Sequence, residues 1–372
     1  MARTRWIISN TGSTEKPIFY HCISRVVDRR FAFERDEKEK FRMFMRMYEK
    51  FTGCRVVSYC LMCNHFHLLL EVPPLPEGGF SDSELLERLT ALYTPAVVAG
   101  VAKDLAKARE MGYQNQVEEI HGRYTRRMHD LSRFMEGLLQ RFTRWFNRAH
   151  SRTGNLWEDA FKSVIVEDGV AARTICAYID LNPVRAGMVA DPAEYRWSSY
   201  GEAMGGGSRG NGKKARAGLV RALMAHKGCA ADSRLWAGKV SKDYRMLLFE
   251  AGEEKLAEVT NVAGEREVKV VRKGIKKAVA SAELDQLERN RDVALGKMLR
   301  CRVRYFTDGA VIGSRSFVNE MFENARQRFG SKRKNGARKM RGIGVPAAGI
   351  LWSFRDLQKG DSFPKANRKV YF

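Results

Sequence analysis

Three stretches near the start of the chain have the apolar and β-branched content of strands, at residues 17–27, 54–62 and 65–72. Only Cys63 and Asn64 separate the second stretch from the third, which predicts a hairpin. Residues 36–51 have apolar side chains at helical spacing and acidic residues in their first turn, where these suit the helix dipole. The predicted order is strand, helix, strand, strand.

A strongly helical segment follows at residues 81–148, with Asp82 as a candidate N-cap. Within it, residues 131–150 carry an apolar stripe with arginines between its members. The stripe consists of Leu131, Phe134, Leu138, Phe142 and Trp145, and the arginines are Arg133, Arg141, Arg144 and Arg148. This pattern is typical of a helix with a buried face and a solvated basic face.

Another strand is predicted at residues 161–166, followed by a helix at 168–182 with Asp168 as its N-cap and Pro183 as its terminator. Together these elements indicate an α+β fold with one central antiparallel sheet and a helical insertion at about 81–150.

The Gly-rich segment 204–214 has the composition of a flexible linker. It divides the chain into a predicted domain at 1–203 and a basic, mostly helical region at 215–372. Within that region helices are predicted at 281–299 and at 314–329, the second capped by Ser314.

The net charge of +23 lies mostly in the second half of the chain. Residues 1–200 contain 29 Lys and Arg against 25 Asp and Glu, whereas residues 201–372 contain 37 against 18. Such a balance favours a polyanionic partner, of which nucleic acid is the commonest. Residues 330–341 alone contain six basic residues and no acidic one. Residues 270–341 are interpreted either as a helix-turn-helix-like accessory module or as a solvated basic tail.

No apolar run reaches the ~20 residues that a membrane-spanning helix needs, so no membrane association is expected. The seven cysteines are odd in number and scattered, unlike a disulfide framework. A reducing cytoplasm suits this distribution best.

Two of the chain's seven histidines, His65 and His67, lie two residues apart in the third strand. They therefore project from the same face, where they could hold one divalent ion or simply face solvent. Cys60 and Cys63 extend the pair to C-x2-C-x-H-x-H, which suggests a zinc site. A regular strand would place the two cysteines on opposite faces, which argues against zinc.

Four segments in order resemble the REP-associated tyrosine transposases, a family within the single-tyrosine HUH superfamily. They are "MCNHFHLLLE" (62–71), "LWEDAFKSVIVED" (156–168), "AYIDLNPVRAGMV" (177–189) and "YRWSSY" (195–200). The resemblance covers roughly residues 15–203. It implies a ferredoxin-like catalytic domain in a bacterial, nucleoid-associated protein.

The resemblance further implies which residues act. His65 and His67 match the HUH motif, Tyr178 matches the nucleophile, and Asn182 stands where the family often has a third metal ligand. Such a set suits Mg²⁺ or Mn²⁺. The implied activity is cleavage and rejoining of single-stranded or hairpin-containing DNA through a 5′-phosphotyrosine intermediate. Two positions depart from the family, Cys63 for proline and Glu158 for glutamine, and neither touches the implied chemistry.

The spacing of Tyr178 and Asn182 is consistent with a shared helix face, since residues i and i+4 are neighbours. On spacing alone a half-buried packing tyrosine is the favoured interpretation of Tyr178, since the chain contains 12 tyrosines. Asp180 faces away from it and is expected to be solvated. Tyr195 and Tyr200 are expected to pack beside Trp197.

The expected DNA contacts come from basic and aromatic side chains spread along the chain. They are Arg185, Trp157, Lys162, Arg144, Lys332, Arg333 and Lys334. Arg185 could alternatively be a helix C-terminal charge. The alternative function is a catalytically inactive protein that binds nucleic-acid hairpins in a structural or regulatory role. The resemblance leaves a homodimer and a monomer equally open.

Overall fold

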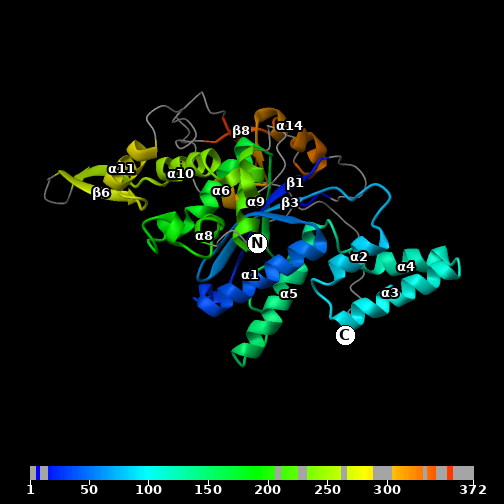
Figure 1. Ribbon diagram of the computed structural model, residues 1–372. Coiled ribbons are helices and arrows are strands. Elements are labelled where there is room, and N and C mark those ends of the chain that lie inside the picture. Colours follow the sequence, from blue (N-terminus) through cyan, green and yellow to red (C-terminus); the bar gives the residue numbers. More distant parts are fainter. Residues whose placement is uncertain are drawn as a thin grey trace.

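A computed structural model describes residues 6–8, 16–205, 211–224, 233–260, 266–287, 304–329, 333–340 and 350–354 (Figure 1). Its centre is a sheet that begins with four strands in the order β2-β3-β1-β4, with every neighbouring pair antiparallel. The strands are β1 (Ile18–Arg25), β2 (Arg55–Leu61), β3 (His65–Val72) and β4 (Lys162–Val166). The predicted strands and hairpin are therefore confirmed.

Side chains of β3 alternate between the two faces of this sheet, as the strand period requires. Phe66 and Leu68 belong to the apolar core on one face, whereas Leu69 belongs to the core on the other. His67 has the same parity as Leu69. It pairs with Ile23 of β1 and Cys60 of β2, so it lies on an inner strand with a neighbour on each side.

Two helices, α1 (Arg35–Thr52) and α5 (Leu131–Ala149), cover the Phe66 face of the sheet (Figure 1). A capping box between Glu34 and Glu37 begins α1, and the Asp130 side chain caps α5. The predicted apolar stripe of α5 is buried there, apart from the half-buried Trp145. The order β1-α1-β2-β3-α5-β4 with both helices on one face is the ferredoxin-like arrangement.

The opposite face is covered by α6 (Val170–Asp180), which leads directly into the short α7 (Asn182–Arg185). Gly169 is the N-cap of α6, with a φ of 86°, so the predicted Asp168 cap is wrong by one residue. The Asp168 carboxylate instead accepts the Gly169 N–H. Pro183 lies in the first turn of α7, where its missing N–H is tolerated, rather than ending the chain's helical path.

The insertion between β3 and β4 contributes three further helices, which gather to one side of the sheet in Figure 1. They are α2 (Asp82–Leu89), α3 (Pro95–Glu110) and α4 (Gln114–Thr125). Ser81, not Asp82, caps α2. Its hydroxyl accepts the Glu84 backbone N–H, and the Glu84 carboxylate accepts the Ser81 backbone N–H. These helices have a small core of their own, to which Phe51 of α1 also belongs.

Strands from the C-terminal region extend the same sheet beyond β4. They are β7 (Val311–Gly313), β9 (Trp352–Phe354) and β8 (Arg338–Lys339), and β7 pairs parallel to β4. Two helices flank β7: α13 (Arg304–Asp308) and α14 (Arg315–Asn324), the latter capped by Ser314 as predicted.

The remaining elements lie beyond α7 and partly cover α6. They are α8 (Ser199–Gly205), α9 (Asn211–Met224), α10 (Lys239–Gly252), α11 (Lys277–Leu287) and the hairpin β5 (Lys255–Thr260) with β6 (Arg266–Arg272). Helix α9 includes 211–214, which composition assigned to a linker. The helix predicted at 281–299 is described only as far as Leu287. A domain boundary at 203/204 stays a prediction.

Among the described helices, none is long and apolar enough to cross a membrane.

Candidate functional site

A cluster of three histidines lies where β1 and β3 face α6. The rings of His65 and His67 are 5.1 Å apart, which confirms that they project side by side. His21 of β1 joins them, with its Nε2 3.1 Å from Nδ1 of His67. His67 is only 3% exposed, so the alternative in which both histidines of the pair face solvent is wrong; His65 is half-buried and His21 is fully buried.

Burial keeps this cluster uncharged at neutral pH. It lowers the pKa of His21 to about 4 and, together with the charge of Arg25, lowers the pKa of His65 to about 4. Burial and the neighbouring His21 also bring the pKa of His67 well below its usual value. A neutral imidazole is the form that binds metal, because it keeps one lone pair.

The hydrogen bonds fix which nitrogen of each ring carries that lone pair. The Phe306 carbonyl can only accept, so His21 Nδ1, 2.8 Å away, must donate to it. A neutral His21 then has an acceptor at Nε2, to which His67 donates from Nδ1. The lone pair of His67 is consequently at Nε2.

His65 is arranged in the same way by its neighbour in the turn. Its Nδ1 is 2.7 Å from the Asn64 side-chain oxygen, which makes Nδ1 the donor and Nε2 the acceptor. Among the described residues, neither Nε2 of the pair has a hydrogen-bond partner. Orientation of metal-binding histidines through the second ring nitrogen is the usual arrangement in proteins.

Tyr178 of α6 lies against this cluster. Its ring meets His67 edge-on at 5.6 Å and His21 edge-on at 5.8 Å, and it packs on Phe306 at 4.7 Å. The guanidinium of Arg185 lies over the same ring at 5.1 Å. The structure thus brings together Tyr178, Arg185 and both histidines of the predicted site.

Asn182 begins α7 one turn after Tyr178. Its Nδ2 donates to the Tyr178 carbonyl at 2.9 Å and to the Ile179 carbonyl at 3.3 Å, so it caps the end of α6. The amide nitrogen is therefore committed to the helix, and the side-chain oxygen is the atom that could bind a metal. Its role as a third ligand stays a prediction.

The zinc alternative is not supported. Among the described residues, no group of three or more His, Cys, Asp and Glu side chains is arranged to hold a metal ion. Cys60 is fully buried and lies 3.6 Å from the Met62 sulfur, whereas Lys38 points its ammonium at Cys63, 3.7 Å away.

Other predicted DNA contacts lie apart from the histidines. Trp157 packs against Phe33, Phe41, Phe66 and Phe142, and its indole N–H donates to Thr143. The ring is half-buried against the core beneath α5, and stacking on a DNA base stays a prediction. Lys162 is exposed at the start of β4, opposite Ile23.

In the basic C-terminal segment, Arg333 lies over the rings of Phe329 and Phe322, and Lys334 is exposed. Lys332 lies outside the described residues. Arg144 is exposed on α5, on the opposite side of the sheet from the histidines.

Asp180 contradicts its prediction, because it is fully buried rather than solvated. Helix α10 covers this side of α6, and its Tyr244 hydroxyl donates to the carboxylate at 2.6 Å, as does the Tyr200 N–H at 2.9 Å. Burial raises the pKa of Asp180 to about 7 despite these donors. Tyr195 packs on Trp197 as expected, with ring centroids 5.7 Å apart.

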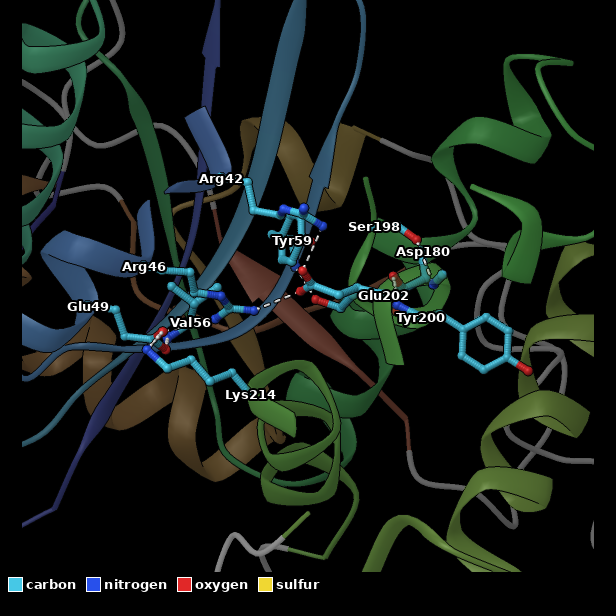
Figure 2. Close-up of polar contacts among 12 residues, drawn as sticks. Arg42, Arg46, Glu49, Val56, Tyr59, Asp180, Ser198, Tyr200, Glu202 and Lys214 are labelled. Atoms are coloured by element: carbon cyan, nitrogen blue, oxygen red, sulfur yellow. Dashed lines mark hydrogen bonds and ion pairs between the residues drawn. The ribbon is translucent and has the colours of Figure 1, made fainter. Parts of the chain in front are cut away.

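A second buried polar cluster joins α1 to α8. Figure 2 shows Arg42 and Arg46 pointing at Glu202, and the distances are 2.9 Å and 3.0 Å. Arg46 also pairs with Glu49 at 2.9 Å, and Arg42 pairs with Glu39. Each of these charges thus meets an opposite charge.

Sequence reasoning missed His21, Phe306 and the loop 27–32. In that loop Phe31 is 80% exposed, and both Asp28 and Arg29 have positive φ. Asn64, the residue before His65, donates to the Arg29 carbonyl at 3.0 Å. One signal for His21 was available, since a rare histidine stands within the mostly apolar run Ile18–Ile23.

Residues 15–77 match the family model described as "Transposase IS200 like", a segment that holds the three histidines but not Tyr178. This match confirms the resemblance for that part of the chain. The chain is also similar to a solved structure of a REP-associated tyrosine transposase bound to a REP hairpin, with 13% identity and a TM-score of 0.34. The likeness covers 72% of this chain and 99% of that one. No curated protein gives a significant match.

Proposed function

We propose that this protein is a DNA transposase that cuts and rejoins single-stranded, hairpin-containing DNA through a covalent bond to Tyr178. The observation that carries the proposal is the hydrogen-bonded chain from the Phe306 carbonyl through His21 to His67. This chain, with the Asn64 bond to His65, leaves two imidazole lone pairs beside one tyrosine ring.

The donor set fits a divalent ion such as Mg²⁺ or Mn²⁺. The proposed ligands are two neutral imidazole nitrogens and the side-chain oxygen of Asn182, which lies one helical turn after Tyr178. Such ions accept these ligands, and imidazole favours Mn²⁺ somewhat. A bound ion would polarise the scissile phosphate and offset the charge that develops on it.

Tyr178 is the proposed nucleophile. Its phenol oxygen forms a bond to phosphorus, the bond from phosphorus to the 3′ oxygen breaks, and the phenol proton is transferred so that the 3′ oxygen leaves as a hydroxyl. Reversal by a different 3′-hydroxyl joins strands, so no nucleotide cofactor is needed. The Arg185 guanidinium places a positive charge over the ring that must carry negative charge during attack.

The loop 27–32 is proposed to hold the DNA beside the cut. Its ends are tied to the turn before His65, since Val26 N–H donates to Asn64 and Phe33 N–H donates to Cys63. Positive φ at two successive non-glycine residues is strained, and such strain gathers at functional sites. An exposed Phe31 beside Arg29 and Arg30 suits stacking on an unpaired base with contact to its phosphates.

The test is adduct formation on single-stranded DNA that carries a label 3′ of the cut. Wild-type protein with Mn²⁺ should give a labelled protein band on a denaturing gel. Tyr178→Phe should lose both the band and the cleavage product, by at least 10³-fold, because only the attacking oxygen is removed.

Tyr195→Phe is the matched control, because its hydroxyl donates to the Leu61 carbonyl and lies in the core. It should keep cleavage at a temperature where it is folded. An adduct mapped to a tyrosine other than Tyr178 would refute the assignment. Hairpin binding without cleavage or adduct in wild type would favour the inactive hairpin-binding protein instead. Homodimer formation and association with the nucleoid stay predictions.

A further inference from the structure

A basic groove lies on the sheet face opposite the histidines. It has a volume of about 500 Å³ and runs between α1, α5 and the segments that follow α2 and α4. Arginines from two elements line it: Arg141, Arg144 and Arg148 from α5, and Arg127 from the segment after α4. Trp145 and Tyr93 line it as well.

The charge of the groove is uncompensated. No carboxylate is among the described residues that line it, although acidic side chains occur elsewhere on α5 and pair there, as Glu136 does with Arg133. Four guanidinium groups in one hollow repel each other unless an anion lies between them. The groove is therefore complementary to an anionic ligand.

Two of the arginines are held in place and two are not. Arg127 donates to the Tyr93 hydroxyl at 2.9 Å, and Arg141 lies over Phe44 at 5.6 Å. Arg144 and Arg148 are exposed, and within the described part of the chain neither makes an ion pair or hydrogen bond. Positions 141, 144 and 148 follow one helix face for about 10 Å, which is long enough to contact more than one group of an extended ligand.

Aromatic rings beside the arginines narrow the ligand class. Trp145 is half-buried against Phe142, and the Lys40 ammonium lies 5.6 Å from its ring. Arginines that meet phosphates, next to rings on which unpaired bases stack, are the features of single-strand binding surfaces. A duplex has its bases already stacked and would use only the charges.

We propose that this groove binds single-stranded DNA, as a second contact separate from the site of cutting. The inference rests on the proposed function, because a strand cut beside Tyr178 must also be held while its end waits for rejoining. In this arrangement α5 grips the flank of the substrate on one face of the sheet, and the histidines and Tyr178 act on the other face.

The test compares two double variants of the full-length protein that lose the same charge. Arg144→Gln/Arg148→Gln removes the unpaired arginines of the groove. Arg123→Gln/Arg133→Gln removes two exposed arginines outside it that are paired with Glu119 and Glu136. The probe is a mixed-sequence single-stranded DNA oligonucleotide, and its Kd is measured across a salt series by fluorescence anisotropy.

The groove variant should bind about tenfold more weakly at 0.1 M salt, and its salt slope should fall by about 1.4, since about 0.7 of an ion is released for each phosphate contact on a single strand. The control variant should lie within threefold of wild type. Equal losses in the two variants would overturn the proposal. An effect on a duplex of the same sequence as large as that on the single strand would also overturn it, as would stronger competition by polyglutamate than by oligonucleotide.

The experiments distinguish refutation of DNA binding by the groove from refutation of the proposed function. Tyr178→Phe should retain the wild-type Kd and salt slope, because it leaves the groove intact. Adduct formation by wild type together with unchanged binding by the groove variant would refute only the groove. A wild-type protein that forms no adduct, yet shows the groove-specific loss of binding, would refute only the covalent chemistry.

Discussion

The histidine cluster between the sheet and α6, and the ion pairs that join α1 to α8, are both polar groups buried against the same sheet. In the ion pairs, one Glu202 oxygen accepts from Arg42 and the other from Arg46 (Figure 2). In the histidine cluster, burial removes the protons instead, and the Nε2 lone pairs of His65 and His67 meet no partner among the described residues.

The ion-pair cluster satisfies its own polar groups, whereas the histidine cluster leaves two acceptors for another partner. Burial of polar groups alone does not indicate a function, because Glu202 is as deeply buried as His67. What distinguishes the histidines is that each ring donates its one N–H, while two Nε2 acceptors meet no donor among the described residues. Polar atoms without a protein partner are satisfied by water or by a ligand, so these two lone pairs are suited to bind one.

The largest expected effect would come from breaking the ion pairs between α1 and α8. Glu202→Gln leaves the buried Arg46 and the largely buried Arg42 without their shared counter-charge, so the free energy of unfolding should fall by about 3–5 kcal/mol. Urea unfolding measures this loss. Glu87→Gln is the control, because its ion pair with Lys50 is exposed and contributes less than about 1 kcal/mol. Equal stability of the two variants would show that the buried pair adds nothing.

At the histidine cluster, a bound ion should instead add to the stability of the protein. Mn²⁺ at a hundred times its Kd should stabilise wild-type protein by about 2.7 kcal/mol, seen as a rise in Tm. His65→Ala and His67→Ala should each lose that rise. His150→Ala should keep it, since His150 is at the surface beside Glu37. A rise that survives in both cluster variants would place the ion elsewhere.

A smaller effect is expected at His21, which does not bind the proposed ion itself but positions His67, which does. His21→Phe removes the acceptor for His67 Nδ1 and should weaken Mn²⁺ binding by about 10–100-fold in calorimetry. His21→Gln keeps an acceptor and should recover part of the affinity. Unchanged Mn²⁺ affinity in both variants would mean that His67 needs no partner to be oriented.

The smallest of these effects should come from Phe31, in the loop that is tied to the turn before His65. Phe31→Ala should raise the KM for single-stranded DNA by about tenfold, since one base–aromatic stack contributes about 1–3 kcal/mol. Tm should not change, because the ring is 80% exposed. Phe31→Trp should bind as well as wild type. A lower kcat with unchanged KM would assign the loop to the chemical step instead.

The local sequence pattern was enough to predict the strand and the helix that carry the candidate site residues. Period-two alternation placed His65 and His67 on one face, and the helix predicted at 168–182 placed Tyr178 and Asn182 on a common helix face. These features depend on neighbours within about eight residues. The boundary details were less accessible, because Ser81 and Asp82 are both good caps and backbone geometry decides between them.

Long-range contacts could not be predicted in this way. His21 bonds to Phe306, which lies 285 residues further along the chain. Asp180 was expected in solvent because nothing in its own helix reveals that α10 covers it. Trp157 packs against four phenylalanines from distant elements, and its own segment gives no sign of these contacts. In each case the unpredicted feature is a contact with an element that is distant in the chain.

The bond between His21 and the Phe306 carbonyl also sets when the histidine cluster can be completed during synthesis of the chain. A ribosome that has made α6 must still add more than a hundred residues before Phe306 exists. At bacterial and eukaryotic rates of about 5–20 residues per second, that interval lasts roughly 5–25 s. Until then His67 lacks its oriented partner and Tyr178 lacks the ring on which it packs. A nascent or prematurely ended chain therefore carries the whole HxH motif and Tyr178, but it lacks the carbonyl to which His21 donates and the ring on which Tyr178 packs.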